Sequence, residues 1–220
     1  MIKRLLSYFF PIPHKVVQSP VSEQLEITWL NGKLILDTKH ANYSYGSLQK
    51  ILRYGLQQIG FDNIREMQNI LILGVGGGSV IKTLLEEIKF KGMLTGVDLD
   101  PVVLQIAKKY FDLKEDEQLK LYQQDALNFI MKNNEQFDLI IIDIFQDIIM
   151  PDFLFEKPFI DHVKKSMNLS GTLLFNTIVY NQQIQEKITF YKYHFNQNDY
   201  KIYSFPEIEE KNELIIIQKK

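Results

Sequence analysis

The chain has 220 residues, of which 45% are hydrophobic and 24% are charged, and its formal net charge is -2. This length suffices for one complete hydrophobic core, and so weak a net charge gives no general attraction to nucleic acid. Cysteine is absent, which excludes disulfides, thiolate metal sites and a cysteine nucleophile, and which fits a cytoplasmic protein. The four histidines show no ligand spacing, so no metal site is predicted.

The first ten residues combine Lys3 and Arg4 with aliphatic and aromatic side chains. The apolar run ends at Pro11 without a small-residue cleavage site, so it does not predict a signal peptide. No segment reaches the roughly 18 apolar residues of a membrane-spanning helix, and stable membrane insertion is not expected. We expect a tail that packs on the body of the protein or on a second subunit of a homodimer. A membrane-surface role for this aromatic, basic segment is the alternative.

Two short β-like pieces follow, at residues 25–30 and 33–36, joined by Asn31-Gly32. Asn-Gly is the dipeptide that best suits the tight turn of a hairpin. A polar, aromatic loop with Tyr45 then leads into a helix that Gly60 closes. We therefore expect an N-terminal tail and β-hairpin over residues 1–45 and a larger domain over residues 46–220.

The larger domain is organised around one stretch, residues 69–100. Ile70 to Leu73 are four consecutive branched apolar residues, too few for a helix, and predict a buried parallel strand. Apolar residues at helical spacing follow, and then a second strand that ends at Asp98. The turn between the first strand and the helix is made of glycines, namely Gly74, Gly76, Gly77 and Gly78.

This pattern indicates a site for a nucleoside. Glycines let a ligand touch backbone that a Cβ would shield, and the N–H groups at a helix start favour anionic or polar ligand atoms. An acid at the end of the next strand, here Asp98, can accept hydrogen bonds from two ribose hydroxyls. The dinucleotide fingerprint would need Gly or Ala where Ser79 stands, so NAD is the weaker alternative. The alternative without a ligand is a domain that uses these glycines only for tight packing.

Two more acids stand at the ends of predicted strands. Asp125 follows a short strand at residues 119–122 and precedes a helix, where it can act as a helix cap, as a ligand of the cofactor, or as both. Asp143 ends the most apolar stretch of the chain, residues 137–142. Ligands of open α/β sheets bind outside the carboxyl ends of strands near the topological switch, so Asp143 is a site candidate. Its structural alternative is a cap or a partner for a lysine.

The remaining segments complete an α/β fold. Residues 146–155 are expected to lie over the site, and strands and helices alternate up to the end of the chain. The last two strands, near residues 200–205 and 214–218, have no helix between them, which favours an antiparallel final strand. The fold class predicted from these elements is a Rossmann-like sheet of seven strands, preceded by the small N-terminal hairpin.

With these motifs in view, residues 22–180 resemble the spermidine synthase family, the polyamine aminopropyltransferases, and more broadly the class I S-adenosylmethionine-dependent methyltransferases that share its fold. The resemblance rests on the hairpin that ends at Asp37, Tyr45 at a helix start, the glycine loop, Val97-Asp98-Leu99-Asp100, Gln124-Asp125-Ala126 and the spacing to Asp143. It implies that Gly74, Gly76 and Gly78 shape the cofactor loop, that Asp98 holds the ribose, that Leu99 also contacts the cofactor, and that Asp125 and Ala126 border the adenine. It also implies that Asp143 faces the cofactor's tail or the incoming nucleophile.

The chain departs from the synthase pattern at two acids. Gly77 stands where synthases have an aspartate in the glycine loop, and Gln146 stands where they have the second acid of a D-S-x-D pair. An aminopropyl donor is cationic, as is its polyamine acceptor, and each close charge pair is worth roughly 1 to 4 kcal/mol. Losing two acids lowers the attraction for amines and removes repulsion against a carboxylate, so the tail pocket should tolerate full S-adenosylmethionine. Asp147 is the alternative source of the acid lost at Gln146, which keeps the synthase function open.

Three functions are compatible with these residues. The first is a transferase that passes the methyl group of S-adenosylmethionine to an unidentified small acceptor, with Asp143 orienting or deprotonating the acceptor and Tyr45 bordering its pocket. The second is a spermidine synthase-type aminopropyltransferase of polyamine biosynthesis that uses decarboxylated S-adenosylmethionine. The third is a non-catalytic nucleotide-binding or assembly module. Nucleic acid is not an expected partner in any of them.

Overall fold

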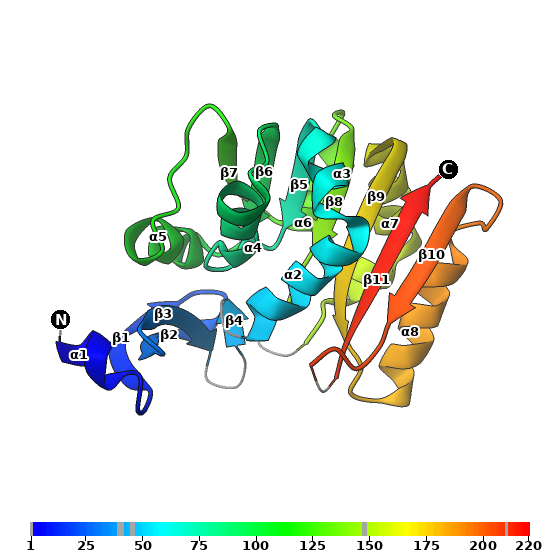
Figure 1. The fold of residues 1–220 in the computed structure, drawn as a ribbon. Coiled ribbons are helices and arrows are strands. Elements are labelled where there is room, and N and C mark those ends of the chain that lie inside the picture. The colour runs from blue at the N-terminus through cyan, green and yellow to red at the C-terminus, as the bar shows by residue number, and fades with distance from the viewer. Residues whose placement is uncertain (1, 39–41, 45–46, 147–148, 210) are drawn as a thin grey trace.

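The computed structural model of the chain describes residues 2–38, 42–44, 47–146, 149–209 and 211–220. Its larger part is a seven-stranded sheet with helices on both faces, as Figure 1 shows. The order across the sheet is β10-β11-β9-β8-β5-β6-β7. In chain order these strands are β5 (Asn69–Leu73), β6 (Met93–Asp98), β7 (Leu119–Gln123), β8 (Phe137–Ile142), β9 (Met167–Ile178), β10 (Tyr200–Phe205) and β11 (Asn212–Lys219).

The central strands are parallel and buried on both faces. β5 pairs in parallel with β6 and with β8, and Ile70 to Leu73 are completely inaccessible to solvent. β11 runs antiparallel to β9 and to β10. The predicted α/β fold with seven strands and an antiparallel final strand is therefore confirmed.

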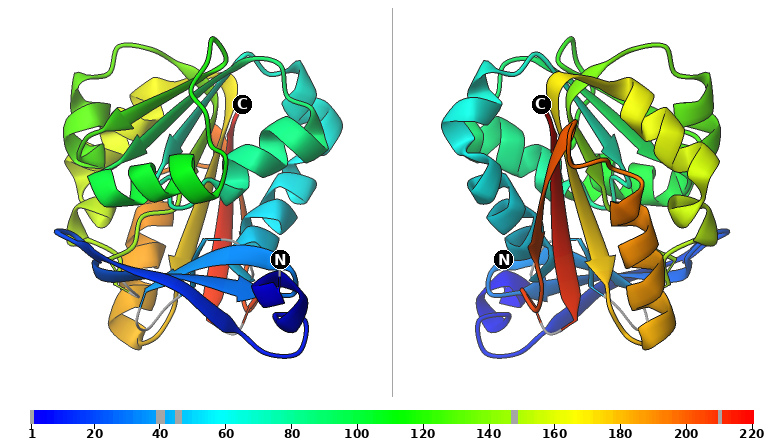
Figure 2. Two further views of the ribbon diagram at one scale, coloured as in Figure 1. Left: turned by 90° about the vertical axis from the view of Figure 1, so that its left-hand side faces the viewer. Right: turned by 90° about the vertical axis from the view of Figure 1, so that its right-hand side faces the viewer.

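Helices cover the two faces of the sheet, as the two views of Figure 2 show. One apolar core lies between the sheet and α2 (Ser47–Ile59), α3 (Phe61–Glu66), α4 (Ser79–Lys82), η1 (Thr83–Ile88) and α5 (Pro101–Tyr110). The other lies beneath α6 (Ala126–Lys132), η2 (Asp152–Phe155), α7 (Lys157–Ser166) and α8 (Gln182–Tyr193). None of the helices in the described ranges is long and apolar enough to cross a membrane.

Two helical details differ from the sequence expectation. The helix after the glycine turn begins as α4 and widens at Thr83 into the π-helical turns of η1. Gly60 ends α2 but also stands at the N-cap of the short helix α3, with a φ of 97° that suits glycine. Apolar spacing marks the buried face of a helix, but it does not separate an α-turn from a π-turn or mark a helix as short as α3.

The N-terminal part begins with α1 (Ile2–Leu6) and then forms an antiparallel sheet of four strands. The predicted hairpin is confirmed as β2 (Glu23–Leu30) and β3 (Lys33–Thr38), and Asn31 and Gly32 both take positive φ in its turn. β4 (Asn42–Ser44) pairs with β3. Residues expected to be part of a tail instead form β1 (Ile12–Ser19), paired with β2. β1 is a largely exposed edge strand, so its residues lack the hydrophobic alternation that would have predicted it.

The small sheet is fixed to the main sheet through α5. Three of its buried residues pack against α5 and the turn after it, in a cluster of Leu25, Ile27, Leu36, Val103, Ile106 and Phe111. Asp100 is completely buried and caps α5, because its Oδ1 accepts from the backbone N–H of Val102 at 2.8 Å. Its Oδ2 accepts from the hydroxyls of Ser19 and Ser22. These bonds hold the turn after β1 beside the carboxyl ends of the parallel strands.

Candidate active site

A cavity of about 380 Å³ lies at the carboxyl ends of β5, β6 and β8, where the sheet changes its direction of winding. Seven of the residues predicted to form the site line it, namely Gly74, Gly76, Asp98, Leu99, Asp125, Ala126 and Asp143. Gly77 and Gly78 do not line it, although both belong to the same loop. Tyr45 lies outside the described residues, so its predicted role stays a prediction.

Gly74 brings the ends of β5 and β8 into contact. Its φ is 92°, and a Cβ built on it would lie 2.0 Å from the carbonyl oxygen of Asp143. The backbone N–H of Asp143 in turn donates to the carbonyl of Leu73 at 2.9 Å. Gly78 is used differently. At a φ of 83° it stands before α4, and its neighbour is the side chain of Leu113 rather than the cavity.

Asp98 connects the glycine loop to the end of β6. Its Oδ2 accepts from the backbone N–H groups of Val75 and Gly76, both at 3.0 Å, and its Oδ1 accepts from that of Asp100 at 2.9 Å. A carboxylate oxygen has two lone pairs, so Oδ1 keeps one acceptor position for a ligand hydroxyl. Burial raises the pKa of Asp98 to about 6, and the three backbone bonds oppose that rise. Asp98, the residue predicted to bind the ribose, therefore also fixes the shape of the glycine loop.

Asp143 stands at the head of a chain of side-chain amides. Its Oδ1 accepts from Asn176 Nδ2 at 2.8 Å, and Asn176 Oδ1 accepts from Asn212 Nδ2 at 3.0 Å. Burial, together with the charge of Asp98, raises the pKa of Asp143 to about 6, while the bond from Asn176 opposes the rise. A carboxyl group with such a pKa can exchange a proton near neutral pH, as a general base must.

Sequence reasoning missed the two asparagines, although both line the cavity. Asn176 is completely buried in β9 directly after the apolar run Leu173 to Phe175, and an amide at the carboxyl end of such a run is the signal that could have identified it. Asn212 begins β11 and carries no comparable signal. Only the pairing of β9 with β11 brings the two together.

Asp125 serves as the cap of α6, because its Oδ1 accepts from the N–H of Asn128 at 2.9 Å. It also lines the cavity, so the cap and a place in the site coexist. The segment 146–155 forms part of the wall, as expected, through Gln146, Pro151 and Phe153, and Phe145 just before it also lines the cavity. Further apolar wall residues come from elements far apart in the chain, Val21 after β1, Ile51 in α2 and Ile178 in β9.

The raised pKa of Asp143 predicts how stability depends on pH. The folded carboxyl keeps its proton up to about pH 6, whereas the unfolded one loses it near its ordinary value of 3.8. The free energy of unfolding should therefore fall as the pH rises from about 4 to about 6. Asp143→Asn removes this loss, and its amide oxygen can still accept from Asn176. We expect the variant to match the wild type at about pH 4 and to be more stable by about 1 to 3 kcal/mol at about pH 7.5.

Urea unfolding of both proteins between about pH 4 and pH 8 measures this difference. Asp138→Asn is the matched control, because burial works to raise the pKa of Asp138 but bonds from Gln68, Asn69 and Asn168 lower it overall. The control should lose stability at neutral pH. A variant at position 143 that is less stable than the wild type at neutral pH would contradict the raised pKa.

Comparison with known proteins places this chain in a family. The family model of the spermine/spermidine synthase domain matches residues 49–220, which is most of the chain. The chain belongs to the spermine/spermidine synthase family. The match begins within α2 and runs to the end of the chain. It therefore reaches further toward the C-terminus than the resemblance over residues 22–180, and it leaves out the small N-terminal sheet.

Relatives of this synthase family member include both aminopropyltransferases and methyltransferases, all of them transferases. The polyamine aminopropyltransferase of Vibrio vulnificus is 33% identical over 113 residues, which are 50% of this chain and 38% of that protein. The chain spans less than two thirds of the length of the curated relatives it matches.

Solved structures share the fold. A probable spermidine synthase from Corynebacterium glutamicum superposes with a TM-score of 0.73 at 15% identity, over 94% of this chain and 79% of its own. Human methyltransferase-like protein 13, solved in complex with SAH, superposes with a TM-score of 0.69 at 20% identity, over 80% of this chain and 83% of its own. The fold of this family member is therefore common to both kinds of transferase.

Proposed function

We propose that the cavity binds S-adenosylmethionine and that the protein transfers its methyl group to a small nucleophile. A volume of about 380 Å³ lies in the range of small-ligand pockets. Asp98, beside the bare backbone of the glycine loop, is the acceptor for the ribose hydroxyls, and Leu99, Asp125 and Ala126 border the base. The SAH complex of the human methyltransferase-like protein supports a nucleoside of this class in such a fold.

The charge around Asp143 is the observation that favours methyl over aminopropyl transfer. The other polar side chains of the described lining at this end of the cavity are neutral amides, Gln146, Asn176 and Asn212. An aminopropyl donor brings a cationic amine without a carboxylate. Among the described lining residues the acids are Asp98, Asp125 and Asp143, and the first two are proposed to contact the ribose and the base. Asp143 is then left to offset the cost of burying that amine with a second cationic amine. The zwitterionic tail of S-adenosylmethionine needs an acceptor for its ammonium group and no strong negative field against its carboxylate, which this set of side chains supplies.

Asp143 is the residue that would handle the proton. The acceptor's lone pair forms a bond to the methyl carbon as the carbon–sulfur bond breaks, and the bonding pair stays on sulfur. The proton that the acceptor loses passes to the carboxylate of Asp143, which Asn176 holds in place at 2.8 Å. Tyr45 is proposed to border the acceptor. The protein's main remaining contribution is to place the acceptor in line with the carbon–sulfur bond.

Aminopropyl transfer is the second candidate, and two observations favour it. The matching family model is that of the spermine/spermidine synthase domain, and the Vibrio vulnificus relative is a polyamine aminopropyltransferase. The superposition on the probable spermidine synthase covers 94% of this chain, against 80% for the methyltransferase-like protein. In this reaction the donor would be decarboxylated S-adenosylmethionine. The amine nitrogen of the polyamine would bond to the aminopropyl carbon as the carbon–sulfur bond breaks, the bonding pair would stay on sulfur, and Asp143 would bind the attacking amine and take its proton.

Ligand-dependent melting separates the candidates. A ligand at about 100 times its Kd stabilises the folded state by about 2.7 kcal/mol, which raises the Tm of a chain of this size by roughly 5 to 10 °C. We expect such a shift with S-adenosylmethionine and a much smaller one with its decarboxylated form. The reverse order would establish the aminopropyl donor as the ligand. No shift with either compound would contradict both enzymes and favour the non-catalytic module.

A further inference from the structure

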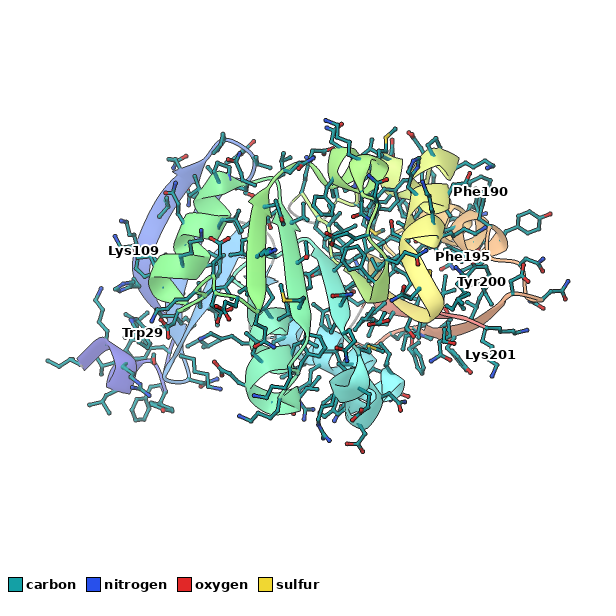
Figure 3. The ribbon with its side chains drawn as sticks, turned by 90° about the horizontal axis from the view of Figure 1, so that it is seen from above. Trp29, Lys109, Phe190, Phe195, Tyr200 and Lys201 are labelled. Carbon is teal, nitrogen blue, oxygen red and sulfur yellow. The ribbon has the colours of Figure 1, made fainter. Side chains whose placement is uncertain are left out.

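The N-terminus presents a cluster of exposed apolar side chains. Ile2 is 74% exposed and Phe9 is 84% exposed, and the whole cluster, here called the N-terminal patch, consists of Ile2, Leu5, Leu6, Tyr8, Phe9 and Phe10. Single exposed apolar residues need no explanation, but a group of them so close together in the chain forms a surface of the kind that binds something. Figure 1 and Figure 3 show α1 at the extreme end of the molecule, beyond Trp29.

The patch is held in place rather than hanging free. Ser7 is buried, and its carbonyl and hydroxyl accept from the backbone N–H groups of Asn31 at 2.8 Å and of Gly32 at 3.0 Å. Arg4 Nε donates to the carbonyl of Gly32 at 3.1 Å. These bonds fix α1 and the residues after it on the turn between β2 and β3. These hydrogen bonds hold the backbone that carries the apolar side chains in one position. Binding to a partner therefore costs little further conformational entropy.

Charge identifies the partner. Residues 2–22 contain no Asp or Glu, whereas Lys3, Arg4 and Lys15 lie within them, in a chain whose net charge is -2. Basic side chains beside exposed aromatic and aliphatic ones are the composition of segments that lie in the surface of an anionic membrane. The apolar and aromatic side chains then enter the boundary between headgroups and acyl chains, and the nearby Lys and Arg side chains are attracted to the anionic headgroups.

We propose that the N-terminal patch binds the surface of membranes that contain anionic lipids. A symmetric contact with a second copy would place Lys3 and Arg4 against cations of the same kind, which opposes association. Single-stranded nucleic acid would use aromatic and basic side chains but would gain nothing from Ile2, Leu5 and Leu6. The proposal concerns attachment to one leaflet and does not depend on what the cavity binds.

Co-sedimentation of the full chain with vesicles tests the proposal. We expect binding to vesicles of phosphatidylcholine and phosphatidylglycerol in a roughly 3:1 ratio, and little binding to vesicles of phosphatidylcholine alone. Lys3→Glu reverses one charge and should weaken binding more than about tenfold. Phe9→Ser should weaken it by a similar factor. Raising the salt concentration should weaken binding by the wild type.

Tyr193→Ser is the matched control, because Tyr193 is 85% exposed on α8, far from the patch in the chain. It should bind as the wild type does, and circular dichroism checks that every variant is folded. Equal binding by Lys3→Glu, Phe9→Ser and the wild type would overturn the proposal, as would the absence of binding to anionic vesicles. Two other results would assign the patch to another partner if the wild type does not bind vesicles. A dimer in sedimentation equilibrium that Phe9→Ser abolishes would assign it to a second copy of the chain. Binding to single-stranded RNA that Phe9→Ser abolishes would assign it to nucleic acid.

Discussion

Replacing Gly74 by alanine is expected to destabilise the fold by about 3 kcal/mol or more and to abolish nucleoside binding. The φ of 92° is unfavourable for any residue with a Cβ, and that Cβ would lie 2.0 Å from the carbonyl oxygen of Asp143. Because the obstacle is backbone, no side-chain rotation relieves it. The ends of β5 and β8 must move apart, and the carboxylate of Asp143 moves with them. Urea unfolding and the melting shift with S-adenosylmethionine measure the two effects.

Gly60→Ala separates the clash from the strain of positive φ. Gly60 has a φ of 97°, but the atoms nearest to a Cβ there belong to the Asn63 side chain, with Nδ2 at 3.0 Å, and not to the backbone. We expect this control to lose about 1 to 2 kcal/mol and to keep its response to the ligand. If the two alanine variants were equally stable, the close approach of β5 to β8 at Gly74 would not exist in the folded protein.

Asp98→Ala is expected to abolish the melting shift with S-adenosylmethionine and to lower the affinity for it about 100-fold or more. Charge-assisted hydrogen bonds are worth about 1.5 to 3 kcal/mol each, and Asp98 is proposed to make them to the ribose. The variant should also lose about 1 to 3 kcal/mol of stability, since the N–H groups of Val75 and Gly76 lose their acceptor. Titration calorimetry with SAH measures the affinity directly.

Asp138→Ala controls for the structural part of this effect. Asp138 accepts from two backbone N–H groups, those of Gln68 at 2.7 Å and Asn69 at 3.0 Å, as Asp98 does in the loop. It stands near the start of β8, at the opposite end of the strand from Asp143. The control should be destabilised and should still bind. An Asp98→Ala protein that binds as tightly as this control would show that the ribose does not lie at Asp98.

Asp98 also illustrates how far the local pattern reaches. Four apolar residues, a run of glycines and an acid after the next strand were enough to predict a buried strand, a turn and a carboxylate at the edge of the sheet. The hairpin turn at Asn31 and Gly32 was equally local, as was Asp125 before α6. In each case, the preference of a few adjacent residues for one backbone conformation carries the information.

The partners of these residues depend on which strands pair. Asn176 reaches Asp143, and Asn212 reaches Asn176, because β9 lies between β8 and β11. In the same way, β1 exists because it can pair with β2. Short-range sterics and hydrophobic spacing govern where the chain turns, which strands are buried and which acids end them, so these features were readable from the order of residues. Strand pairing selects which amides reach Asp143 and which apolar residues close the cavity, because the free energy of such contacts depends on segments that meet only once the chain has folded.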